Sequence, residues 1–298
     1  MKIESLLDDV NKGAFLIKDA DRAAVNALRR TLMVDVPKMA ITRAMFNQGT
    51  TDDDSGNGKM ESTNVLPDEV IAHRLAMIPI PTNLEDFHFQ DECPECMNLP
   101  EKERGCQSCQ IIYGVKARGN AEGVVVRAGD FDPITDDEYP IAERFHSIPI
   151  TKVYEGQYIE VYGYAVLGRG RDHIKWSPVS GVAFEANRVA LLKNAKQAEE
   201  VFFSLDIDFS ADEFTKGKLT DPLRVIELDK AMNLVRKDSG REESFNDAIV
   251  LEEIEGEYIL RFDSDGSYMS PNAVMRQACI ELRDRFAHIQ EELNISLD

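Results

Sequence analysis

The chain has 298 residues, of which 43% are hydrophobic, a composition typical of a folded globular protein with room for two domains. Its 54 acidic and 34 basic residues give a formal net charge of -20, which opposes binding of the chain alone to a nucleic-acid backbone. No apolar run approaches the roughly 18 residues of a membrane span. The charged first residues, MKIESLLDDVNK, do not resemble a signal peptide, so we expect a cytoplasmic protein.

The clearest predicted helix covers residues 19–37 and follows an apolar run, residues 14–17, that predicts a strand. Val25, Leu28 and Leu32 recur at i, i+3 and i+7, so they form one apolar stripe along the helix. An aspartate at the start of the segment is a suitable cap, and the proline at its end cannot continue the helix. The stripe needs an apolar surface to cover it.

Arg29 and Arg30 lie beside this stripe. They fit a helix that contacts a carboxylate-bearing neighbour, but an ordinary core helix with a solvated basic edge is the simpler interpretation. After the helix, residues 39–46 have the pattern of a strand, and the polar tract 50–59 is expected to be an exposed loop. Residues 66–81 then predict a short helix that ends before its prolines.

Four cysteines form two CxxC pairs, Cys93 with Cys96 and Cys106 with Cys109, separated by nine residues. This spacing brings four thiolates around one ion, and a cytosolic setting argues against disulfides. Zinc held by four sulfurs has no open position for water, so it would order loop 93–109 without catalysing hydrolysis. An iron–sulfur cluster and a redox dithiol are the alternatives, and the paired knuckles favour zinc.

Basic residues near the cysteine loop are expected to neutralise the excess charge of the thiolates, namely Lys102, Arg104, Lys116 and Arg118. From residue 111 to 166 the pattern predicts an antiparallel β domain. Residues 167–184 contain neither GK[ST] nor GxGxxG, so a packed turn at Trp176 is a better interpretation than a phosphate loop.

Residues 185–256 are charged, loosely periodic and free of cysteine. A strand over 258–262 and a turn then lead to a long C-terminal helix, with Ser270 as its cap and Pro271 at its first position. A second apolar stripe runs along this helix. It consists of Val274, Ala278, Leu282, Ile289 and Leu293. The remaining cysteine, Cys279, is expected to be a small core residue of the same helix.

Four stretches together resemble the family of D subunits of archaeal RNA polymerases: DADRAAVNALRRTLMVDVP, LPDEVIAHRLAMIPI, LGRGRDHIKWSPV and YILRFDSDGSYMSPNAVMRQA. That family is the counterpart of the eukaryotic third-largest subunit and of the bacterial alpha N-terminal domain. The resemblance implies an α+β fold in two parts. Residues 1–38 and 184–298 would form a discontinuous α/β dimerisation domain, and residues 39–183 an inserted antiparallel β-rich domain that carries the metal loop.

The resemblance also implies a function. The chain would be a non-catalytic assembly platform that pairs with a small alpha-like partner, the L subunit, to seat the large catalytic subunits, and it would hold no catalytic magnesium or nucleotide. Arg29 and Arg30 would face a large catalytic subunit. The partner interface would comprise Val25, Leu28, Arg29, Arg30, Leu32, Val274, Ala278, Leu282 and Ile289.

The sequence departs from the family pattern in three ways. Ala76 stands where relatives often have glycine. Residues 185–256 lack the cysteines of the cluster domain that many archaeal relatives carry, which excludes an iron–sulfur cluster there. The four cysteines instead follow the IPI segment, at the place where their arrangement resembles a zinc loop of the eukaryotic counterpart. This resemblance favours zinc over an iron–sulfur cluster. The alternatives from other classes are a free-standing cysteine-ligated metalloprotein, with zinc or an iron–sulfur redox centre, and a nucleic-acid-binding zinc ribbon, which the acidic charge disfavours.

Overall fold

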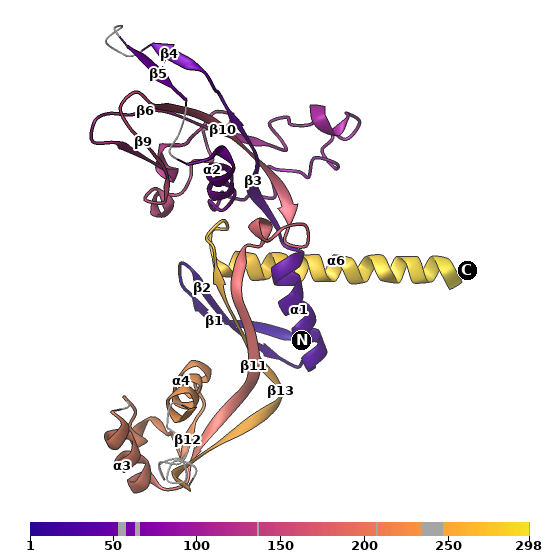
Figure 1. Ribbon diagram of the computed structural model, residues 1–298. Helices are drawn as coiled ribbons and strands as arrows, with labels where there is room; N and C mark the ends of the chain where they lie inside the picture. Colours follow the sequence, from indigo (N-terminus) through magenta and orange to yellow (C-terminus); the bar gives the residue numbers. More distant parts are fainter. Residues whose placement is uncertain (53–57, 63–65, 136, 207, 234–246, 298) are drawn as a thin grey trace. The chain divides into compact units, whose positions relative to one another are not determined.

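Helices and antiparallel sheets alternate along the chain, so the α+β class is confirmed (Figure 1). The computed structural model describes residues 1–52, 58–62, 66–135, 137–206, 208–233 and 247–297. They group into two compact units, residues 1–29 with 181–262 and residues 30–180 with 263–298. The sequence-based division had placed 263–298 with the N-terminal segment. The limits expected for the dimerisation domain, 1–38 with 184–298, and for the inserted domain, 39–183, stay a prediction.

The first unit is built on a five-stranded sheet in the order β1-β2-β13-β11-β12. Its strands are β1 (Lys2–Asp8), β2 (Lys12–Lys18), β11 (Val179–Leu192), β12 (Lys218–Leu219) and β13 (Ile249–Ser264). The strand predicted over 14–17 is the buried part of β2. Phe15 on β2 stacks on Phe262 of β13 with ring centroids 5.6 Å apart. The sheet therefore joins the N-terminal hairpin to a strand more than 200 residues later.

Residues between β11 and β13 fold as a small helical subdomain of the first unit. It contains α3 (Ala195–Leu205), η5 (Ala211–Glu213) and α4 (Pro222–Asn233). Asn194 caps α3 by accepting a hydrogen bond from the main-chain N–H of Gln197 at 3.3 Å. The core of the subdomain includes the buried side chains of Phe202, Val225 and Leu228. Residues 234–246, which follow α4 in the sequence, lie outside the described part of the chain.

The second unit carries an antiparallel four-stranded sheet in the order β3-β10-β6-β8. Its strands are β3 (Pro37–Phe46), β6 (Ile111–Arg118), β8 (Asp132–Pro133) and β10 (Tyr158–Arg169). Two smaller sheets pair β4 (Thr50–Asp52) with β5 (Lys59–Glu61) and β7 (Val124–Arg127) with β9 (Pro149–Val153). The antiparallel β region predicted over 111–166 is confirmed. The predicted loop 50–59 instead forms a hairpin at its ends, and residues 53–57 lie outside the described residues.

The core of the second unit is packed between its sheet and α2 (Asp68–Ala76). Ile71 and Leu75 on one face of α2 join Ile41, Tyr113 and Val161 from three strands in a single buried cluster. The predicted short helix is confirmed, with Pro67 before it and two acidic residues in its first turn. Short 3-10 segments complete the unit: η1 (Glu101–Glu103), η2 (Ala128–Asp130), η3 (Glu143–Phe145) and η4 (Ile174–Trp176).

Two longer helices occupy the segments that the apolar stripes predicted. In α1 (Arg22–Val34), the main-chain N–H of Ala24 donates to the Asp21 carboxylate at 2.6 Å, so Asp21 is the cap. In α6 (Pro271–Leu297), the N–H of Ala273 donates to the Ser270 hydroxyl at 3.3 Å. None of the helices in the described ranges is long and apolar enough to cross a membrane.

Candidate metal centre and the exposed C-terminal helix

The cysteine loop lies between α2 and β6 and makes one tight turn at each CxxC pair. The N–H of Cys96 donates to the carbonyl of Cys93 at 3.1 Å, and the N–H of Cys109 donates to that of Cys106 at 3.1 Å. Each turn brings its two sulfurs to the same side of the backbone. Gln107 ties the second turn to the β domain through a 2.8 Å hydrogen bond to the carbonyl of Thr135.

The four sulfurs converge on one point. Cys93 and Cys106 are 3.4 Å apart, Cys106 and Cys109 are 3.6 Å apart, and Cys96 and Cys109 are 3.8 Å apart, measured between Sγ atoms. All four lie within 4.8 Å of one another. A tetrahedral ion with metal–sulfur bonds of about 2.3 Å needs sulfurs roughly 3.8 Å apart. The four-cysteine cluster is therefore able to hold a metal ion.

Burial and hydrogen bonding act differently on the four thiols. Main-chain N–H groups of Gly105 and Cys106 point at Cys96 and lower its pKa to about 7. Burial raises the pKa of Cys106 to about 11 and also raises the pKa of Cys109. Ionising all four in this buried cluster needs a compensating cation, so metal binding there releases protons.

Two of the four basic residues predicted to neutralise the thiolates make contacts elsewhere. Lys116 on β6 pairs with Glu160 on β10 at 3.3 Å, so its charge is directed to the sheet. Arg104 donates from Nε to the carbonyl of Leu99 at 3.0 Å and so braces the loop backbone. The compensating positive charge has to come chiefly from the ion itself.

The apolar stripe of α1 is not an open surface. Val25, Leu28 and Leu32 are 0% exposed in the chain by itself, as are Val274 and Ala278 at the start of α6. These five side chains pack in the chain's own core, and their part in a partner interface stays a prediction. Of the other predicted interface residues, Arg30 is exposed, and the half-buried Arg29 donates to the side chain of Asn26 at 3.0 Å.

The C-terminal half of α6 carries a row of exposed apolar side chains. Every residue from 283 to 294 is exposed. Phe286, Ile289 and Leu293, spaced i, i+3 and i+7, are 59%, 44% and 56% exposed, and they continue the stripe from the half-buried Leu282. Phe286 is absent from the predicted stripe, which passes from Leu282 directly to Ile289. It lies four residues after Leu282 and therefore on the same face of the helix, so the helical spacing predicts it.

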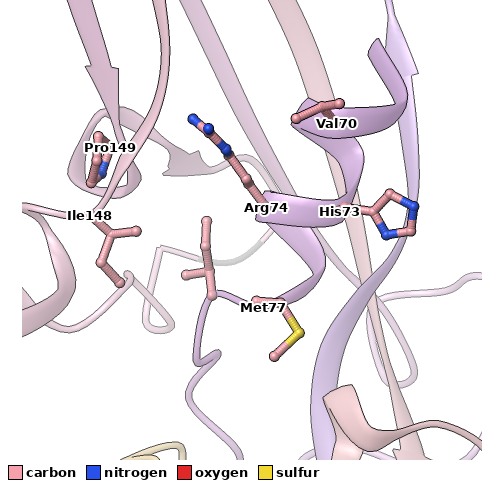
Figure 2. Close-up of a pocket in the computed structure, with 7 residues that line it drawn as sticks. Val70, His73, Arg74, Met77, Ile148 and Pro149 are labelled. Carbon is pink, nitrogen blue, oxygen red and sulfur yellow. The ribbon is translucent and has the colours of Figure 1, made fainter. Parts of the chain in front are cut away.

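A shallow groove of about 370 Å³ lies beside α2 (Figure 2). It is lined by Val70, His73, Arg74, Met77, Ile78, Ile148 and Pro149. Arg74 Nη1 donates to the carbonyl of Ile150 at 2.8 Å, which joins α2 to β9.

The glycine-rich segment at the end of β10 is a packed turn, as predicted. Trp176 Nε1 donates to the carbonyl of Val166 at 3.1 Å, and a Cβ at Gly168 would lie 2.3 Å from the indole ring. A Cβ at Gly170 would lie 2.1 Å from the carbonyl oxygen of Met33. Both glycines are explained by close packing, without a phosphate ligand.

Residues 14–286 match the family model of the RNA polymerase Rpb3/Rpb11 dimerisation domain. The chain belongs to this family. It is 31% identical over 286 residues to DNA-directed RNA polymerase subunit Rpo3 of Picrophilus torridus, covering 94% of this chain and 95% of that one. The Rpo3 of Thermoplasma volcanium is 30% identical over 285 residues, with the same coverage of each chain.

A eukaryotic relative is more distant. The chain is 24% identical over 318 residues to "DNA-directed RNA polymerases I and III subunit rpac1" of Dictyostelium discoideum, covering 98% of this chain and 82% of that one. The near full-length Rpo3 relatives confirm the resemblance to the archaeal D subunits, for which Rpo3 is the other name. The match reaches from β2 into the exposed half of α6 and so includes both units.

Proposed function

We propose that this Rpo3-like chain is a non-catalytic assembly subunit of DNA-dependent RNA polymerase. It forms a heterodimer with a small Rpb11-like protein, the L subunit in archaea, and the pair seats the large catalytic subunits. The observation that carries the proposal is the dimerisation-domain match over residues 14–286 together with the exposed stripe of Phe286, Ile289 and Leu293 near its end. Catalytic magnesium and nucleotide are bound by other subunits, and the chain works in the cytoplasm.

Burial of the α6 stripe is the main apolar contribution to this pairing. A Phe, Ile or Leu side chain contributes about 1.5–3 kcal/mol when it passes from water into a packed interface. Three such residues do not fill the roughly 1,000 Å² or more of a stable interface. Further contacts have to come from polar or half-buried surface. Arg29 and Arg30 remain proposed contacts of a large catalytic subunit.

Copurification tests the proposed pairing. The tagged chain and the Rpb11-like subunit of the same organism are expressed together, and the Phe286→Asp/Ile289→Asp double variant is compared with Ile134→Asp, an exposed isoleucine in the β domain. We expect wild type and Ile134→Asp to retain the partner and the double variant to lose it. Retention of the partner by all three would contradict the proposed interface.

The metal we propose for the cluster is one structural zinc ion, held by Cys93, Cys96, Cys106 and Cys109. The support is the sulfur spacing, which fits a tetrahedral ion, and full ligation by thiolates, which leaves no site for an exchangeable water. Elemental analysis and a visible spectrum test this. One zinc in a colourless protein is expected, whereas iron and brown absorption would demand a cluster. The free-standing metalloprotein alternative has no observation of its own in its favour.

A further inference from the structure

A buried carboxylate lies where α1 ends. The side chain of Asp35 is 3% exposed, and one of its oxygens, Oδ1, is contacted by two arginines. Arg171 Nη2 is 3.0 Å from it, and Arg285 Nη2 on α6 is 2.5 Å from it. A carboxylate at such a position is stable only when cations or donors replace the water it has lost. Asp35 therefore holds Arg171 and Arg285 in place.

A second ion pair holds the same helix one turn earlier. Arg169, the last residue of β10, lies 2.6 Å from the carboxylate of Glu281 on α6, and it also donates to the main-chain carbonyl of Asp35. Gln277 supports Glu281 with a 2.9 Å hydrogen bond. All these residues belong to the second unit. They fix α6 to the ends of α1 and β10.

The anchored face of α6 sets the direction of its apolar face. Gln277, Glu281 and Arg285 are spaced by four and share one side of the helix. At about 100° per residue, the stripe through Leu282, Phe286, Ile289 and Leu293 lies roughly a quarter turn away. Arg285 immediately precedes Phe286, so the last anchoring contact is adjacent in sequence to the first exposed residue of the apolar stripe.

We propose that Asp35, with Arg169 and Arg171, is an anchor that fixes the rotation and exit direction of α6, so that the exposed stripe is presented preformed to the Rpb11-like partner. The inference rests on the proposed function. A helix already held in its bound geometry loses less conformational freedom on binding, which strengthens association without a new intermolecular contact. These anchoring residues are thus positioning residues and do not need to touch the partner.

Two measurements on the full-length chain test the anchor. Hydrogen exchange of the α6 amides is measured in the chain alone, and the dissociation constant for the Rpb11-like subunit is measured with the purified pair. The variants are Asp35→Asn, Arg285→Gln and their combination. The matched control is Arg283→Gln, because Arg283 is exposed and pairs with its neighbour Asp284 at 2.7 Å.

We expect Arg285→Gln and Asp35→Asn each to speed exchange in α6 and to weaken partner binding about tenfold. The combined variant should bind the partner no more weakly than the single variant with the larger loss of affinity, because both substitutions remove the same ion pair. Arg283→Gln should stay within about twofold of wild type in affinity. Hydrogen exchange outside α6 should not change in Arg285→Gln, which separates positioning of α6 from general destabilisation. Arg285→Gln therefore keeps the test valid even if Asp35→Asn folds poorly.

The anchor is overturned if Arg285→Gln leaves both α6 exchange and affinity at wild-type values while Phe286→Asp/Ile289→Asp abolishes binding. In that case the proposed function still stands. If Phe286→Asp/Ile289→Asp binds the partner normally, the proposed interface is wrong. The anchor is then judged by hydrogen exchange alone: faster exchange of α6 in Arg285→Gln supports it, and unchanged exchange overturns it.

Discussion

At the scale of single residues, the four cysteines offer the most direct test of the metal site. Cys109 is fully buried, and its sulfur lies within 3.8 Å of both Cys106 and Cys96. Cys109→Ser should abolish stoichiometric zinc binding and open loop 93–109 to proteolysis, because three thiolates and a hydroxyl bind zinc far more weakly. Metal analysis and limited proteolysis check this.

The control for that variant is Cys279→Ser, which changes a half-buried cysteine on α6 outside the cluster. It should keep one zinc per chain. A Cys109→Ser protein that retains a full equivalent of zinc and an intact loop would contradict the four-thiolate site.

Arg224 in the helical subdomain provides a pH-dependent test. Its Nε and Nη2 atoms lie 2.8 and 3.1 Å from the two carboxylate oxygens of Glu213, and its guanidinium stacks 3.8 Å from the ring centroid of Phe209. Hydrogen bonding by Arg224 lowers the pKa of Glu213. The pair therefore stabilises the fold above the ordinary carboxyl pKa, and this stabilisation is lost as the pH falls through the lowered value.

Glu213→Gln should reduce the free energy of unfolding by about 1 kcal/mol at pH 7, after allowance for partial solvent screening. The difference from wild type should shrink in acid, as the pH falls through the lowered pKa and Glu213 takes up a proton. Urea unfolding at pH 7 and at a pH below that pKa measures the difference. Glu227→Gln is the control on the same arginine, with a more exposed carboxylate. An equal loss at both pH values would refute the ionic explanation.

Residue-level prediction succeeded where the signal was local. The two CxxC turns are complete within four residues each, so spacing alone identified them. The Asp35 anchor could not be found this way. Arg171 and Arg285 are 136 and 250 positions from it in the sequence, and each looks like an ordinary surface charge until the fold brings them together.

At the scale of elements, periodicity predicted the long helices but not which parts would be covered. Val25, Leu28 and Leu32 share a face, as their spacing indicated, and that face is buried in the chain. The stripe on α6 has the same kind of spacing, yet it is buried at Val274 and open at Phe286. Spacing shows which side chains lie together; burial depends on contacts distant in sequence.

The helical subdomain was the least predictable region. Short helices such as α3 and α4 carry a weak apolar pattern among many charges, and their shared core forms only when Phe202 packs with Val225 and Leu228. Those contacts are tertiary, so propensity within the segment could not reveal them.

Removing the exposed half of α6 tests its role as an element. A chain that ends after Leu282 should fold with almost unchanged thermal stability, because residues 283–294 are exposed and add little to the core. The deletion also removes the ion pair between Arg285 and Asp35, so a small decrease in thermal stability is expected. The shortened chain should no longer bind the Rpb11-like subunit in a pull-down. Undiminished binding would place the interface elsewhere.

At the scale of the whole molecule, the sheet order explains why both ends of the chain carry family signatures. β2 near the N-terminus neighbours β13 near the C-terminus. Strand patterns alone could not have paired them, since the alternation within one strand does not specify its neighbour. The resemblance supplied this pairing of the two ends in outline. It did not predict that residues 263–298 group with residues 30–180.

The net charge of -20 leads to a prediction for the isolated chain. It should show no measurable binding to duplex DNA at about 0.15 M salt, because its negative field repels phosphates that come within the Debye length of about 8 Å. A fluorescence anisotropy titration tests this. Tight, salt-sensitive binding by the chain alone would favour a nucleic-acid-binding protein over an assembly subunit.

Calorimetric titration of the purified chain with the Rpb11-like subunit tests the central claim most directly. We predict a 1:1 heterodimer with a negative heat-capacity change, as expected when apolar surface is buried, and a loss of binding in Phe286→Asp/Ile289→Asp. Absence of binding by the wild-type chain, or equal affinity in the double variant, would contradict the account.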